Sequence, residues 1–265
     1  DELSIIRQAA KLKSNDTHLY KPADAYRMNG YQIKDPNGAG KNHYAGVSVH
    51  YYLENFDEEQ DSVVLSFTNE VDTVLRSFCN KAEEKADELK VVDGANRFVW
   101  NLKTTSAKKF DGMVFWWGSL DGPKLMPGEY KVSLSVNGKE QQQTFEIMKD
   151  PRVSYTDGQL EEQFDFITEV NEKVTNAHEA IIEMRSLKSQ MSDFSELHET
   201  ENIKQKVMEL DSALSRIEKE LYQTQNKSRQ DPLNFPIRLT NKLAHLNSLA
   251  QMGDGPPTNQ MIAVK

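Results

Sequence analysis

The stretch YKVSLSVNGKE, residues 130–140, decides how the first half of this chain folds. From Tyr130 to Val136 an apolar residue stands at every second position, and a Lys or Ser stands between each pair. This alternation is typical of a β-strand with one buried face and one face in water. The pair Asn137 and Gly138 suits a two-residue hairpin turn, because both residue types tolerate a positive φ. The stretch therefore predicts a strand that turns back into a second, antiparallel strand.

Three further stretches repeat the alternation and are separated by turn-forming residues. They are VSVHYYL at 47–53, SVVLSFT at 62–68 and RFVWNL at 97–102. About seven short strands within about 100 residues, with no helical pattern between them, indicate an antiparallel β-sandwich of immunoglobulin or fibronectin type. A small closed barrel is the alternative architecture. We assign this β domain to residues 45–150.

The second half of the chain, residues 151–265, has a helical spacing instead. Apolar residues recur every three or four positions over 160–191, which predicts a helix of about 35 residues. A row with the 4-3 spacing of a coiled coil covers 203–221, and a third row covers 239–250. Thr258 can cap the start of a fourth helix. We therefore expect a mixed fold, an all-β domain followed by an all-α, up-down helical bundle of three helices with the fourth truncated.

Two stretches carry weaker patterns. Residues 1–44 have little periodicity and many turn-forming residues, which predicts an extended arm or linker. In DPLNFP, Asp231 can cap a helical turn at Pro232, but Pro236 lacks the N–H that a continuous helix would use. We therefore expect a short turn here, followed by a fresh helical start at Pro236.

The composition excludes several classes of protein. Among the 265 residues, 41 acidic side chains oppose 32 basic ones, and the net charge of -9 disfavours binding to nucleic acid. Cys79 is the only cysteine, so neither an intrachain disulfide nor a thiolate metal cluster can form. The sequence contains no run of about 18 apolar residues, so it predicts no membrane-spanning helix. The chain begins DELSIIRQ, without a signal-peptide pattern, and we expect it to be a fragment of a longer mature protein.

Partial motifs for phosphate and zinc binding are present, and both lack a necessary residue. Gly38, Gly40 and Lys41 resemble a phosphate-binding loop, but Asn follows the lysine where Ser or Thr would bind magnesium. His178 is followed by Glu, as in a zinc-protease helix, but Ile182 stands in place of the second histidine. We therefore assign no catalytic residue, no metal ligand and no cofactor.

The stretch DGMVFWWGSLDG, residues 111–122, places two tryptophans side by side. We interpret it as a strand, in which neighbouring side chains point to opposite faces. One of Trp116 and Trp117 should then lie in the β core with Trp100, and the other should point outward. The outward ring could pack between domains, stack on a ligand, or stay partly exposed.

A binding hypothesis follows from the same rings. An exposed tryptophan can stack on the apolar face of a sugar. Together with Tyr51 or Tyr52, the outward member of the pair Trp116 and Trp117 would make a carbohydrate-binding module. This is the alternative to a purely structural function.

Several stretches together resemble one known family. They are AGVSVHYYL at 45–53, RFVWNLK at 97–103, PGEYKVSLSVNGKEQQQTFEIMKDPR at 127–152 and LYQTQNKSRQDPLNFPIRLTNKLAHL at 221–246. The combination closely resembles the C-terminal region of bacterial sortilin-like (Vps10-type) proteins with BNR or Asp-box repeats, which are labelled glycosyl hydrolases. HLYKPADAYR at 18–27 is similar to the exit from the β-propeller of that family.

The resemblance carries expectations about location and chemistry. It implies an exported bacterial protein, periplasmic or on the cell surface, with a β-propeller upstream of this chain. It also implies that any glycosidase chemistry belongs to the propeller. No Asp-box of the form Ser-x-Asp-x-Gly-x-Thr-Trp occurs here, so no catalytic residue is carried over from the family. We therefore expect a non-catalytic accessory region that packs on the propeller or mediates interactions with a carbohydrate or protein partner.

Overall fold

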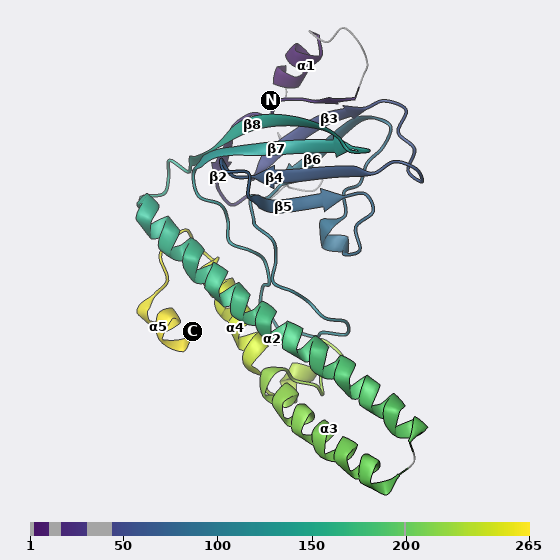
Figure 1. Cartoon of the computed structure of the whole chain (residues 1–265). Helices are drawn as coiled ribbons and strands as arrows, with labels where there is room; N and C mark the ends of the chain where they lie inside the picture. The colour runs from purple at the N-terminus through teal and green to yellow at the C-terminus, as the bar shows by residue number, and fades with distance from the viewer. Residues whose placement is uncertain (1–2, 11–16, 31–43, 199) are drawn as a thin grey trace. The chain divides into compact units, whose positions relative to one another are not determined.

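The computed structural model describes residues 3–10, 17–30, 44–198 and 200–265. Its contacts divide the chain into two compact units. The β unit comprises Asp1–Thr105 and Lys124–Asp157, and the helical unit comprises Ser106–Pro123 and Gly158–Lys265. The fold is thus mixed, as expected, and the helical unit is built from two separate pieces of sequence. Figure 1 shows the sheets and helices of the two units.

The described residues of the β unit form two sheets. The three-stranded sheet is antiparallel and has the order β1 (His18–Leu19), β3 (Val47–Leu53), β6 (Gly94–Trp100). The five-stranded sheet has the order β2 (Ala25–Arg27), β8 (Lys139–Lys149), β7 (Gly128–Val136), β4 (Val63–Thr68), β5 (Val74–Cys79). Only the pairing of β2 with β8 is parallel among these described strands. The helix α1 (Leu3–Ala9) and the short η1 (Lys85–Asp87) complete the unit.

The hairpin predicted at Asn137 and Gly138 is confirmed. Val136 pairs with Lys139 across the turn, and the two turn residues have φ values of 50° and 81°. A two-residue turn with positive φ at both positions matches the right-handed twist of the strands that it joins. The alternation in 47–53 is confirmed as well, because buried and half-buried residues alternate along all of β3.

Aromatic side chains fill the space between the two sheets. Phe67 of β4 stacks on Trp100 of β6, with ring centroids 4.0 Å apart. Tyr130 and Phe145, on the adjacent strands β7 and β8, stack at 6.2 Å. All four rings are buried, as expected for Trp100 from its strand pattern. Offset aromatic contacts of this kind add to the free energy gained by burial alone.

Residues expected to form only an extended arm also contribute strands. His18–Leu19 pairs with β3 in one sheet, and Ala25–Arg27 pairs with β8 in the other. The Leu19 N–H also donates to Gln141 at 2.8 Å. Strands of two and three residues are too short for an alternation to be recognised in the sequence, which explains why they were not predicted. The partial phosphate loop at 38–41 lies outside the described residues.

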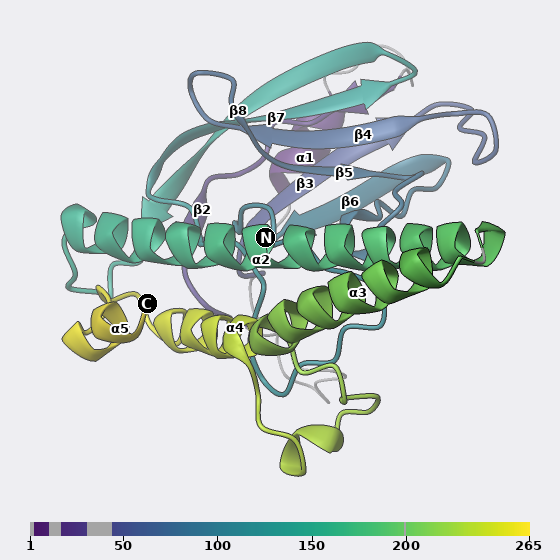
Figure 2. The same ribbon diagram turned by 60° about the horizontal axis from the view of Figure 1, so that its bottom comes forward.

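The helical unit contains the expected helices. They are α2 (Asp157–Leu197), α3 (Glu201–Leu221), η2 (Asp231–Leu233), α4 (Leu239–Ala250) and α5 (Asn259–Val264). Thr258 caps α5 as predicted, since its hydroxyl accepts the N–H of Met261 at 3.2 Å. The predicted helical start at Pro236 is wrong, because Arg238 still has an extended backbone and α4 begins one residue later. Figure 2 shows α2 and α3 as an antiparallel pair.

Burial in the β core can be tested by changing valine to alanine at a buried position and, separately, at an exposed one. Val63 of β4 is buried, whereas Val74 of the adjacent β5 is exposed. We expect Val63→Ala to lower the free energy of unfolding by about 2 kcal/mol, because it removes two buried carbons and leaves a cavity. Val74→Ala should change it by less than about 0.5 kcal/mol. Urea unfolding of both variants measures the difference, and equal losses would contradict this assignment of the core.

Candidate functional site: an aromatic groove in the helical unit

The tryptophan stretch is not a strand. Trp116 and Trp117 form a bend within an irregular loop, Ser106–Pro123, that belongs to the helical unit. Positive φ angles at Gly112 (73°), Trp117 (50°) and Gly118 (109°) interrupt any extended conformation. The prediction that one tryptophan lies in the β core with Trp100 is therefore wrong, and both indoles lie at the surface.

Apolar side chains fix both ends of this loop to the helices. Ala107 and Leu120 are part of a buried cluster with residues of α2 and α4, including Val170 and Ala244. Phe110 belongs to a second buried cluster. The other members of that second cluster are Ile181, Met184 and Tyr222. The loop is thus a component of the helical core rather than a covering over it.

Asn241 of α4 fixes the backbone at the tryptophans. Its carboxamide oxygen accepts the N–H of Trp116 at 3.0 Å. Its amide nitrogen donates to the carbonyl oxygens of Trp116 at 3.1 Å and Trp117 at 3.0 Å. Asn241 is buried, so these bonds replace hydration that the loop backbone has lost. One side chain therefore determines the path of the bend.

Two further asparagines hold the next turn of the loop. The amide nitrogen of Asn247 lies within 3.0 Å of the carbonyl oxygens of Ser119 and Asp121 and within 2.8 Å of the Asn171 side-chain oxygen. Asn171 in turn donates to the Asp121 carbonyl at 2.8 Å. Both asparagines are buried. A buried polar network with satisfied partners specifies one conformation, because each lost bond leaves an unpaired group.

Close packing between the loop and α4 also requires a glycine. A Cβ on Gly118 would lie 2.9 Å from the Cβ of Ala244, and the positive φ of Gly118 disfavours any other residue. The Ser119 N–H donates to the Ala244 carbonyl at 2.9 Å beside this contact. The loop backbone therefore lies directly against the helix, and the tryptophan side chains cannot turn inward there.

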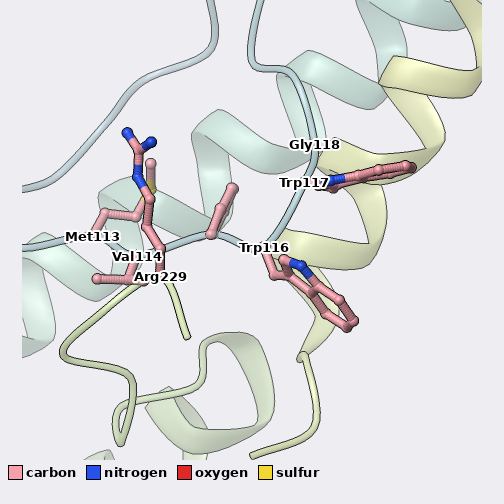
Figure 3. Close-up of a pocket in the computed structure, with 7 residues that line it drawn as sticks. Met113, Val114, Trp116, Trp117, Gly118 and Arg229 are labelled. Carbon is pink, nitrogen blue, oxygen red and sulfur yellow. The ribbon is translucent and has the colours of Figure 1, made fainter. Parts of the chain in front are cut away.

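The outer side of this loop forms an open groove of about 470 Å³. Residues 113–118 and Arg229 line it, as Figure 3 shows. The exposed fractions are 45% for Trp116 and 72% for Trp117. The indole of Trp117 lies edge-on to His245, with ring centroids 6.1 Å apart. In Figure 3 the two indoles extend away from Arg229, so the groove has exposed aromatic faces on one side and, on the other, a guanidinium that can bind an anionic group.

The two tyrosines predicted to assist Trp116 and Trp117 belong to the β unit. Tyr51 is buried in β3, and burial raises the pKa of its phenol well above the ordinary value. Its ring is therefore part of the core and is not accessible to a ligand. Tyr52 is half-buried and pairs with His18 of β1. The tryptophans line the groove without a contribution from Tyr51.

His178, the histidine of the partial zinc motif, has a structural environment. It is buried on α2, and its Nδ1 lies 2.5 Å from the Lys108 carbonyl in the loop. Burial lowers the pKa of this imidazole, and the bond to Lys108 only partly offsets the effect. Phe110 packs edge-on against the ring at 4.9 Å. Within the described residues, no three His, Cys, Asp or Glu side chains are close enough to hold a metal ion.

Comparisons with known proteins give no family to which the chain can be assigned. No protein-family model, curated protein or solved structure matches it. Within the described ranges, no helix is sufficiently long and apolar to span a lipid bilayer.

The role of Asn241 can be tested by truncation. We expect Asn241→Ala to lower the free energy of unfolding by about 2–3 kcal/mol, because three loop groups lose their buried partner. Asn234→Ala, at an exposed position of the same unit, should change it by less than about 0.5 kcal/mol. Urea unfolding, monitored by the circular dichroism signal of the helices, gives the free energy of unfolding of both variants. A loss for Asn241→Ala no larger than that for Asn234→Ala would contradict the role assigned to the network.

Proposed function

We propose that this chain is a non-catalytic accessory region of an exported, sortilin-like protein whose β-propeller lies upstream. In this proposal an immunoglobulin-like β-sandwich and a helical bundle support the propeller or mediate its interactions. The resemblance of 221–246 to that family supports the proposal, and so does the order of strands in the β unit.

The strand order favours the immunoglobulin type over a closed barrel. Strands β1, β3 and β6 form one sheet, in the positions of the A, B and E strands of such a sandwich. Strands β4, β7 and β8 are neighbours in the other sheet, in the positions of C, F and G. The connections from β3 to β4 and from β6 to β7 therefore pass between sheets, as in a Greek key.

One observation carries the structural role. Three buried asparagines of the helical unit, Asn171, Asn241 and Asn247, hold Ser106–Pro123, which lies in the connection between β6 and β7. A buried carboxylate joins the two long helices instead: Glu218 of α3 accepts hydrogen bonds from Arg185 at 2.8 Å and Lys188 at 3.0 Å, both on α2. Burial raises the pKa of Glu218, but these two cations outweigh it and keep the pKa below its ordinary value. Because two cations keep this carboxylate ionised, it is better suited to a structural ion pair than to proton transfer.

A rate measurement tests the non-catalytic role. We expect the purified chain to hydrolyse a panel of aryl glycosides no faster than buffer alone, because the resemblance places any glycosidase chemistry in the upstream propeller. Each substrate should be measured with the wild-type chain. The blank is the same protein solution after the chain has been denatured and filtered out. Turnover that a single substitution within the chain abolishes would overturn the proposal.

The groove supports a second candidate function, carbohydrate binding. Trp116 and Trp117 are exposed on one loop that buried asparagines hold rigid, so a ligand would pay little to order them. Their indole faces can stack on the apolar faces of sugar rings. The Arg229 guanidinium at the same groove can bind a sugar carboxylate.

A fluorescence titration tests this candidate. We expect neutral and uronic-acid oligosaccharides to change the tryptophan emission. Trp117→Ala should weaken binding by about two- to tenfold, because a stacked aromatic ring contributes about 0.5–1.5 kcal/mol. Tyr155→Ala removes an exposed aromatic ring outside the groove and should leave the affinity unchanged. No change in emission at millimolar sugar would exclude the candidate and leave the accessory role intact.

A further inference from the structure

Helix α3 carries a second row of residues at coiled-coil spacing. The row consists of Lys206, Leu210, Ala213, Ile217 and Glu220, which follow one another at intervals of 4, 3, 4 and 3. Such spacing places them along one face of the helix. We call this row the outer seam. It shares Leu210 and Ile217 with the row at 203–221, and its other members lie farther from the side of α3 that faces α2.

The residues of α3 that face α2 already have contacts within this chain. Leu214 packs against the buried cluster that contains Met184, and Glu218 pairs with Arg185 and Lys188. The outer seam is displaced from that side, and its apolar members are open to solvent. Leu210 is 45% exposed and Ile217 is 51% exposed. Neither apolar side chain is therefore buried by α2.

Helix α2 adds two apolar residues beside the outer seam. Figure 2 shows that α2 and α3 run antiparallel. The pairs of Glu218 with Arg185 and Lys188 set the register, which brings Leu187 about level with Ile217, and Phe194 with Leu210. Leu187 follows Met184 by three residues, as Ile217 follows Leu214, so each is rotated by about 60° from the contact between the helices.

Equal rotations on antiparallel helices place these residues on the same side of the pair. Leu187 and Phe194 are both exposed, like Leu210 and Ile217. Together the four side chains form an apolar strip along one side of the α2–α3 hairpin. A single hairpin cannot bury such a strip, whereas a second hairpin packed against it would complete a four-helix arrangement.

The outer seam is complementary to itself when two copies run antiparallel. With a two-fold axis at Ala213, Lys206 of one copy lies opposite Glu220 of the other. Leu210 lies beside Ile217, offset by one residue or about 1.5 Å along the helix. The small Ala213 meets its own copy at the axis. A parallel arrangement would instead place Lys206 against Lys206 and Glu220 against Glu220, which is repulsive. Charge and size therefore both favour an antiparallel second copy of this chain as the occupant.

We propose that the outer seam of α3 is a self-association surface that pairs two copies of this chain antiparallel about a two-fold axis at Ala213. The interface is isologous, so each copy contributes the same five residues and the flanking Leu187 and Phe194. The carboxylate of Glu220, 3.7 Å from the Arg238 guanidinium within its own chain, is largely exposed and remains accessible to the partner copy. This surface is independent of the tryptophan groove.

Sedimentation of the full chain tests the surface. We expect the mass to rise from monomer to dimer with concentration, and Leu210→Gln with Ile217→Gln to raise the dissociation constant by about tenfold or more. Met208→Gln is the matched control, because Met208 is 60% exposed on α3 but lies about 160° around the helix from Leu210. A monomer at all concentrations would overturn the proposal. So would a dimer weakened equally by Met208→Gln, or one unaffected by the double substitution.

A charge exchange tests the antiparallel geometry. Lys206→Glu places two carboxylates opposite each other in an antiparallel pair, and Glu220→Lys places two ammonium groups there. Each variant alone should dimerise at least about tenfold more weakly, while an equimolar mixture should recover dimer, because every opposed pair then carries opposite charges. Circular dichroism of each variant shows whether α3 remains folded. If folded variants gain no dimer on mixing, the antiparallel pairing is wrong.

Discussion

The structure of the helical unit depends on hydrogen bonds from three buried asparagines to one irregular loop. Asn171, Asn241 and Asn247 come from α2 and α4, and each bonds to the backbone of Ser106–Pro123. An irregular segment brings backbone groups that no helix or sheet satisfies, and burial makes them costly unless side chains replace the water. The carboxamide suits this task because it offers donors and an acceptor without a charge. The loop, the Gly118 contact and the position of the groove all follow from these bonds.

The regular elements could be predicted because their patterns are local. The alternation in β7 and the Asn137-Gly138 turn each depend on a few adjacent residues, and so does the row of apolar residues that α2 buries. The strands β1 and β2 are stabilised by pairing with β3 and β8, far along the chain, and two or three residues carry no period of their own. The start of α4 also differs from the expected start at Pro236. The backbone is still extended at Arg238, two residues after that proline, and the helix begins at Leu239.

The groove could be predicted only in part. The exposure of one tryptophan follows from two adjacent large rings in any extended segment, but the exposure of both follows from the positive φ angles at Trp117 and Gly118. Those angles are fixed by Asn241 and Ala244, more than 120 residues away in the sequence. Arg229, from a different connection, carries no local signal that would associate it with Trp116. When a site is assembled from distant segments, the sequence alone predicts only its aromatic residues.

The position of Ser106–Pro123 in the chain has a consequence for the order of folding during synthesis. All strands of the β unit have been made once Lys149 has emerged, yet the loop between β6 and β7 cannot find Asn241 and Ala244 until α4 follows about 100 residues later. Until the helices have been made, Phe110 and Phe115 are exposed on the nascent chain without the residues that they pack against in the folded protein. Closing so distant a contact is slow. During this interval the exposed aromatic side chains make the chain more prone to aggregation than the folded protein is.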